Sequence, residues 1–182
     1  MYDKQRIESL VKEFLLVIGE NIEREGLVDT PKRVADMIEE MLCSGKYSSE
    51  YTSFNSNDYD GIIIIKDIDF SSICEHHLLP FYGKINIAYI PNEKILGISK
   101  FARIIDDCTK KLQLQEKLAQ EILTNILNSI NPKGIAIHIE ANHICMNIRG
   151  VKRRCSTTTT LNFFGDFKDL KYQQLFIDTI KS

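Results

Sequence analysis

The sequence lacks the features that mark several large classes of protein. No apolar run approaches the ~20 residues that a membrane-spanning helix requires, and no segment repeats within the chain. Acidic residues (25) and basic residues (23) nearly balance, which gives a formal charge of -2. A chain with so little net charge has no general attraction for a polyanion, so we expect neither a membrane nor a nucleic-acid partner.

The number and spacing of the cysteines do not fit a disulfide-bonded protein. The five cysteines are an odd number, and their spacing forms no disulfide framework. The opening residues, MYDKQRIESL, are charged and lack the apolar stretch of a secretory signal peptide. Both features predict a reducing, cytoplasmic setting.

What remains is an ordinary globular composition in two differently patterned parts. The chain has 182 residues, of which 43% are hydrophobic and 26% are charged, enough for one compact unit with a sizeable core. Residues 1–60 predict a helical segment followed by a loop, and residues 61–182 predict the core of the fold. We expect the two parts to form a single structural unit.

Apolar residues recur at three- and four-residue steps in the first part, which indicates two helices. The first covers residues 7–18. The second opens with Thr30 as the predicted N-cap and Pro31 in the first turn, where its missing N–H costs nothing. Its predicted inward face consists of Val34, Met37, Ile38, Met41 and Leu42. Residues 44–60 are polar and predict a loop.

The hydrophobic period changes after residue 60. Runs at 61–65 and 84–90 predict two strands, 99–130 predicts two successive helices, and 135–140, 144–149 and 155–163 predict further strands. This order is typical of an α+β fold with two helices on one face of an antiparallel sheet. An extended segment 143–149 would place His143, Cys145, Asn147 and Arg149 on one polar side.

Two short runs concentrate side chains that bind metal ions: Cys74-Glu75-His76-His77 and His143-Ile144-Cys145. The predicted ligands are Cys74, His77 and Cys145, because Cys74 and His77 are three residues apart and can converge from one tight loop, while Cys145 would come from a distant strand. Three protein ligands leave the fourth tetrahedral position open, as in catalytic zinc sites. His76 and His143 would then lie beside the metal as proton carriers. For any one of these residues alone, the alternative is a buried thiol or a hydrogen-bonded core histidine.

These residues belong to longer runs that together resemble one enzyme family. The runs are Ser72–Gly83 (SICEHHLLPFYG), Gly97–Ile104 (GISKFARI), Gln113–Glu116 (QLQE), Ala141–Gly150 (ANHICMNIRG) and Arg24–Val34 (REGLVDTPKRV). In this order, and over most of the chain, they resemble GTP cyclohydrolase I, the zinc enzyme at the head of folate and pterin synthesis.

The resemblance implies a reaction, a fold and an assembly. GTP and water would give 7,8-dihydroneopterin triphosphate and formate. The chain would adopt the tunnelling fold and form a homodecamer of two face-to-face pentameric rings, each closing its sheets into a barrel. Active sites would lie between subunits, and ring closure would pair strand edges that one subunit leaves open.

The resemblance also implies roles in the chemistry. Zinc (Zn2+) would bind Cys74, His77 and Cys145, and would make hydroxide available at neutral pH for attack on C8 of the guanine. His143 would protonate N7 of the guanine. His76 would carry protons during ring opening and formate release.

The family pattern further implies a substrate-binding set. Glu116 would select guanine by accepting hydrogen bonds from N1–H and the 2-amino group, with Gln115 as a weaker contact to the base. Ser99 would lie near the ribose and is equally typical of a helix N-cap. Lys100, Arg103 and Arg149 would hold the triphosphate. Without the resemblance, each charged member would be interpreted as a solvated surface charge.

Two alternatives to this enzyme remain at the level of sequence. A structural zinc module would need a fourth ligand, such as Cys155 or a histidine, in place of the open position. A related tunnelling-fold enzyme acting on another purine or pterin, such as a thiol-based nitrile reductase, would need an unliganded nucleophilic cysteine. Both site cysteines fall in the zinc pattern, which argues against the second alternative.

Overall fold

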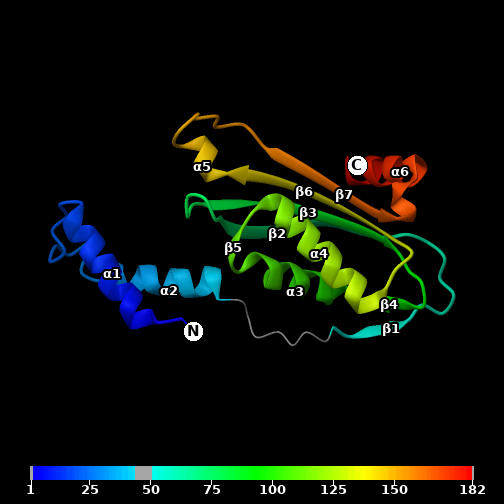
Figure 1. The fold of residues 1–182 in the computed structure, drawn as a ribbon, viewed down its shortest axis with the longest axis horizontal. Coiled ribbons are helices and arrows are strands. Elements are labelled where there is room, and N and C mark those ends of the chain that lie inside the picture. The colour runs from blue at the N-terminus through cyan, green and yellow to red at the C-terminus, as the bar shows by residue number, and fades with distance from the viewer. Residues whose placement is uncertain (1, 44–50, 182) are drawn as a thin grey trace.

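The computed structural model describes residues 2–43 and 51–181. An N-terminal helix pair precedes an α+β core (Figure 1). The helices are α1 (Lys4–Val17), α2 (Thr30–Leu42), α3 (Ile98–Thr109), α4 (Gln115–Ile130), α5 (Ile144–Asn147), the 3-10 turn η1 (Asp166–Lys168) and α6 (Leu170–Lys181). The strands are β1 (Ser53–Asn55), β2 (Ile63–Cys74), β3 (Pro80–Ile90), β4 (Lys94–Leu96), β5 (Leu112–Gln113), β6 (Gly134–His143) and β7 (Thr158–Gly165).

The core is one five-stranded sheet in the order β5-β2-β3-β6-β7. Its four long strands pair antiparallel, and the short β5 adds a parallel edge at the end of β2. Helices α3 and α4 cover one face (Figure 1). The α+β prediction is confirmed.

Strand alternation explains how that face is buried. In the middle of β3 and β6, alternate residues are fully buried in the main core cluster beneath α3 and α4: Ile85, Ile87, Ile137 and Ile139. Successive side chains on a strand point to opposite faces, so this pattern fixes which face the helices cover.

The opposite face carries a smaller apolar cluster that the sequence analysis did not predict. Ala88 and Ala136 lie there with Phe167 of η1 and Phe176 of α6, all fully buried. The small alanines leave room for the two rings. The C-terminal helix is therefore fastened to the end of the sheet where β3 finishes and β6 begins.

The N-terminal pair extends away from the sheet (Figure 1). The predicted cap of α2 was wrong: Asp29 is the N-cap, and Thr30 is the first helical residue, whose hydroxyl donates to the Gly26 carbonyl at 3.3 Å. The predicted inward face is also only partly covered. Met37 is 49% exposed, because within the described chain α2 packs chiefly on α1 and only Pro31 and Ala35 are buried.

Several predicted boundaries differ from the structure. The strand predicted over 144–149 is wrong, because β6 ends at His143 and the short helix α5 follows, closed by a bond from the Ile148 N–H to the Ile144 carbonyl. Strands β2 and β3 reach further than predicted and leave only residues 75–79 as a turn. Of the predicted loop 44–60, residues 44–50 lie outside the described residues and 53–55 form β1.

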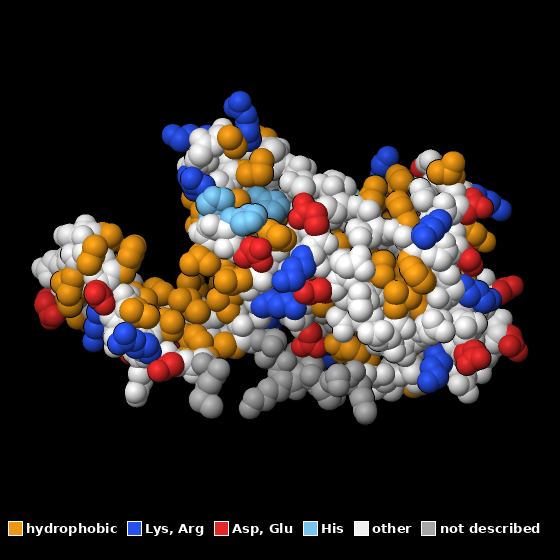
Figure 2. All heavy atoms as spheres, in the orientation of Figure 1, with side chains coloured by type: hydrophobic (Ala, Val, Ile, Leu, Met, Phe, Trp, Pro, Cys, Tyr) orange, Lys and Arg blue, Asp and Glu red, His pale blue; other side chains and the backbone are white. Residues whose placement is uncertain are grey.

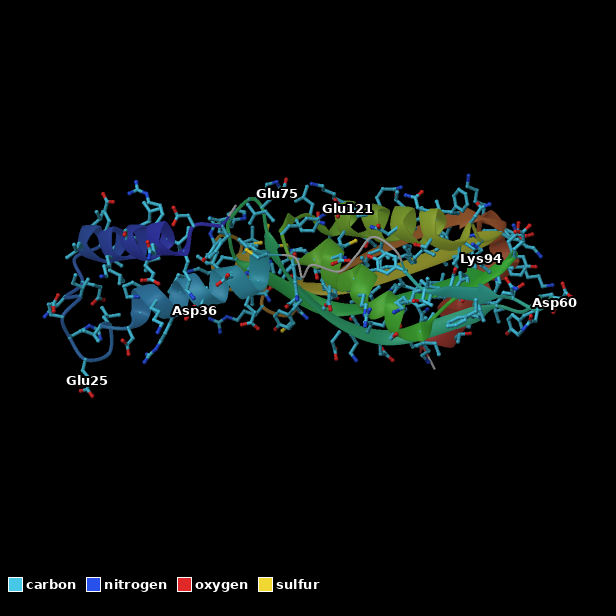
Figure 3. All side chains as sticks on the ribbon, turned by 90° about the horizontal axis from the view of Figure 1, so that it is seen from below. Glu25, Asp36, Asp60, Glu75, Lys94 and Glu121 are labelled. Atoms are coloured by element: carbon cyan, nitrogen blue, oxygen red, sulfur yellow. The ribbon has the colours of Figure 1, made fainter. Side chains whose placement is uncertain are left out.

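The core has two ends with different contents. At one end, β2 and β6 finish and β3 begins, with Phe81 opposite His143. At the other end lie β1, β4 and the start of α3, so Glu75 and Lys94 are far apart in Figure 3. Among the described helices, none has the length and apolar character needed to cross a membrane.

Candidate functional site

Three potential metal ligands converge at the first of these ends. Cys74 is the last residue of β2, His77 lies in the turn that follows, and Cys145 lies in α5. The two sulfur atoms and the imidazole nitrogen all lie within 4.8 Å of one another. Ligands about 70 residues apart in the chain are thus brought together by the pairing of β3 with both β2 and β6.

Backbone hydrogen bonds hold the turn that presents His77. The Cys74 N–H donates to the Leu79 carbonyl at 2.9 Å, and the Leu78 N–H donates to the Cys74 carbonyl at 3.0 Å. Leu78 has a φ of 53°, the left-handed conformation that reverses the chain here. The Glu75 N–H also donates to the carbonyl of Gln113 on β5 at 3.1 Å, which ties the turn to the edge strand.

The donor set fits a zinc ion. Zinc–sulfur bonds of about 2.3 Å and zinc–nitrogen bonds of about 2.0–2.1 Å place tetrahedral donors roughly 3.5–3.8 Å apart, within a small side-chain movement of this cluster. Burial and the nearby Cys74 thiol raise the pKa of the Cys145 thiol. A bound cation reverses that effect, because it stabilises the thiolates that coordinate it.

His143 lies beside this cluster in a well-defined environment. Its ring stacks on Phe81 with the centroids 4.9 Å apart and the planes 3° apart. Its Nε2 atom lies 2.8 Å from Oε1 of Gln115. Burial lowers the pKa of the imidazole, and the Glu116 carboxylate partly opposes that shift. The sequence analysis missed Phe81, whose role depends on strand register.

The remaining predicted residues at this end differ in exposure. His76 is exposed in the same turn, with its ring 6.2 Å from that of His77. Gln115 and Glu116 occupy the first turn of α4, where Gln115 is 2% exposed and Glu116 is exposed. Arg149 follows α5 and is exposed, and its charge lowers the pKa of the Cys145 thiol.

Figure 2 shows histidine side chains gathered near α5, below basic side chains on the segment that follows it. That segment contains Lys152, Arg153 and Arg154, all exposed. A positive surface therefore adjoins the metal cluster and favours an anionic ligand there.

The other three predicted binding residues lie in the first half of α3, Ser99 and Lys100 in its first turn and Arg103 in its second. Ser99 is not a cap, because Gly97 is the N-cap and α3 begins at Ile98. Ten residues of helix separate Ser99 from Thr109, the end of α3 nearer the cluster, a rise of about 15 Å. A single chain therefore does not bring Ser99 and Lys100 together with Cys74, His77 and Cys145, and Arg103 is six residues, a rise of about 9 Å, from that end of the helix.

Comparison with known proteins agrees with the motifs. The family model for GTP cyclohydrolase I matches residues 7–181. The chain belongs to the GTP cyclohydrolase I family. The chain is 43% identical over 175 residues to GTP cyclohydrolase 1 of Streptococcus pyogenes serotype M1, which covers 94% of this chain and 90% of that relative.

Other relatives are longer or more distant. The bifunctional protein FolKE of Lactococcus lactis subsp. lactis (strain IL1403) is 47% identical over 171 residues, 91% of this chain but 49% of FolKE. The chain thus spans about half the length of that relative. An apo archaeosine synthase QueF-Like structure aligns with a TM-score of 0.48 at 18% identity, covering 59% of this chain and 97% of the other. A guanine-bound dihydroneopterin aldolase from Burkholderia thailendensis aligns with a TM-score of 0.43 at 11% identity, covering 59% and 92%.

Proposed function

We propose that this protein is a GTP cyclohydrolase that converts GTP and water into 7,8-dihydroneopterin triphosphate and formate, the first step of folate and pterin synthesis. Family membership supports the proposal, together with 43% identity over nearly the whole of a streptococcal GTP cyclohydrolase 1. The observation that carries it is the convergence of Cys74, His77 and Cys145 beside His143.

Cys74, His77 and Cys145 would hold one zinc ion and leave one coordination position facing the substrate. Zinc bound in this way supplies a water-derived nucleophile at neutral pH and polarises the reacting centre. The structural zinc module is the weaker reading, because Cys155 is exposed and is not part of the cluster.

The two remaining histidines would move protons. His143 would give a proton to N7 of the guanine, which makes C8 electrophilic and allows water to add there. His76, exposed in the same turn as His77, would carry protons as the five-membered ring opens and formate leaves. Because burial lowers the pKa of His143, its charged imidazole gives up a proton more readily than an exposed one would.

Glu116 would select guanine. Its carboxylate is exposed in the first turn of α4 and lies close enough to His143 to affect the pKa of that imidazole. A carboxylate accepts hydrogen bonds from N1–H and the 2-amino group of guanine as a pair, whereas adenine offers no such pair. ATP would therefore leave the charge unmatched.

The triphosphate would be bound across a subunit boundary. Arg149 is near the metal cluster, but Ser99 and Lys100 are at the far end of α3 in the same chain, and Arg103 is one turn further along that helix. We therefore assign those three to a neighbouring subunit in a ring of five, two rings forming a decamer. Ring formation would also cover the edge strands β5 and β7. The five free thiols fit a cytoplasmic enzyme.

The test is to incubate the zinc-loaded, assembled protein with GTP and to measure formate and a pterin that fluoresces after oxidation. ATP at the same concentration is the control and should give neither product. Zinc-loaded, assembled protein that releases no formate from GTP would exclude the proposed function.

A further inference from the structure

The side-chain amide of Gln115 has only one orientation that satisfies its surroundings. Its Nε2 donates to the carbonyls of Ile139 on β6 at 3.1 Å and Thr158 on β7 at 3.0 Å, with the Thr160 hydroxyl at 3.4 Å. A flipped amide would point its oxygen at two carbonyl oxygens. The Oε1 atom is therefore the one that faces Nε2 of His143 at 2.8 Å.

An amide oxygen only accepts hydrogen bonds, so the nitrogen facing it must carry a proton. From this geometry we infer that Gln115 is a positioning residue that keeps a proton on Nε2 of His143, so that Nδ1 is the nitrogen that exchanges a proton with the substrate. The inference rests on the proposed function for the identity of that substrate. Within the described chain, Nδ1 makes no hydrogen bond.

The same contact serves both protonation states that the reaction needs. When the ring is charged, Nδ1–H is the bond that breaks and N7–H of the guanine is the bond that forms. The ring becomes neutral with its remaining proton still on Nε2, bonded to Gln115. No rearrangement of the Gln115 contact is required during this transfer.

Phe81 completes the positioning. Gln115 fixes one edge of the imidazole, and the fully buried Phe81 ring lies parallel to its face. Two contacts in different directions define both the plane and the rotation of the ring. The opposite assignment, a contact from Gln115 to the guanine base, would require its amide to leave three partners, since its side chain is 2% exposed.

Solid-state NMR of sedimented, zinc-loaded protein labelled with 15N only on histidine tests this inference without substrate. The chain has four histidines, so the His143 signals are identified by their loss in His143→Ala. We expect a pyrrole-type Nε2 and a pyridine-type Nδ1 when the ring is neutral. A pyrrole-type Nδ1 in the wild-type protein would overturn the inference, and this measurement does not depend on any variant of Gln115 folding.

Gln115→Met keeps the side-chain volume and removes the acceptor. We expect a mixture of His143 tautomers, retained zinc, and kcat roughly 10- to 100-fold lower with little change in KM. Gln113→Met is the matched control, because Gln113 is equally buried but donates to Cys108 and Glu121 instead of contacting a histidine. Its His143 tautomer should match the wild type.

Two further results separate the possible failures. An unchanged His143 tautomer in Gln115→Met, with a raised KM for GTP, would assign Gln115 to the base and overturn the positioning role. Absence of formate from GTP in the wild-type protein would remove the proposed function only, since the tautomer is measured in the protein alone.

Discussion

Phe81 and His143 are direct partners on neighbouring strands, and their rings lie parallel with centroids 4.9 Å apart. Phe81 is fully buried, whereas His143 is only partly so. The pair thus joins the hydrophobic core to the proposed site of chemistry.

Replacing Phe81 with leucine should separate positioning from stability. We expect a loss of roughly 1–3 kcal/mol in the free energy of unfolding, because a packed ring is replaced by a smaller side chain. Turnover per folded molecule should also fall, because the His143 ring loses its stacking surface. Phe176→Leu is the control: Phe176 is fully buried but packs on Phe167 away from the proposed site, so its loss should cost stability alone. Denaturation curves and kcat for both variants measure the difference.

Cys145→Ser should abolish metal binding and turnover together, because a serine hydroxyl is a poor zinc ligand. Zinc content by elemental analysis and formate release measure the two effects. Cys155→Ser should retain both, since Cys155 is exposed and outside the cluster. Stoichiometric zinc in Cys145→Ser would refute the ligand assignment.

His143→Ala should keep zinc but lose C8 hydrolysis by roughly 100- to 10,000-fold, the usual contribution of a positioned general acid. His138→Ala removes another partly buried histidine from the same strand, away from the metal cluster, and should leave kcat near the wild-type value. Near-normal formate release from His143→Ala would show that another group protonates N7.

Glu116→Gln should lower kcat/KM for GTP roughly 10- to 100-fold, because a hydrogen-bonding pair to a carboxylate is stronger than one to an amide. Thermal stability should hardly change, because the side chain is exposed. Glu75→Gln removes an exposed carboxylate near the same cluster and distinguishes a specific contact from a change in local charge. If the ratio of kcat/KM for GTP to that for ATP is the same in Glu116→Gln as in the wild type, base recognition by Glu116 is refuted.

Stability should fall as the solution becomes more acidic than about pH 6.5, in part through His138. Burial lowers the pKa of His138, with Glu140 opposing, so the unfolded chain takes up a proton at a higher pH than the folded one. The Asn86 amide, fixed by the Asp67 N–H at 2.8 Å, directs its NH2 group toward His138 Nδ1 at 3.1 Å, and protonation there would break that bond. The Tm of wild type and His138→Gln between pH 7.5 and 5 tests this: the variant should show the shallower dependence.

Local spacing was enough to predict much of the site. Cys74 and His77 are three residues apart, a separation that one tight turn can close, and the structure has that turn. The strand predicted through Cys145 was wrong because alternating apolar residues over so short a segment do not distinguish a strand from a single helical turn. Ile148, which gave that pattern its apolar side, is 65% exposed in one chain.

Other features depend on pairings that sequence does not contain. The Phe81–His143 stack follows from the register of β3 with β6, and the environment of Gln115 from the approach of α4 to β6 and β7. Helix α6 was missed because Phe176, its single buried residue in the described chain, gives no apolar stripe and packs at only one end of the sheet. The apolar residues of α1 likewise predicted the helix correctly, but their spacing carries no information on what surrounds it, and several of them are exposed in the structure.

The length of α3 has one more consequence. Since Lys100 and Cys145 are at opposite ends of the core, each active site of the proposed ring would take its triphosphate-binding residues from the neighbouring subunit. Two variants that are inactive for different reasons should then complement each other in a mixed ring. Cys145→Ser and Lys100→Ala, each inactive alone, should regain part of their activity when unfolded and reassembled as a mixture. Each interface that joins Cys145 of a Lys100→Ala subunit to Lys100 of a Cys145→Ser subunit then contains one intact active site.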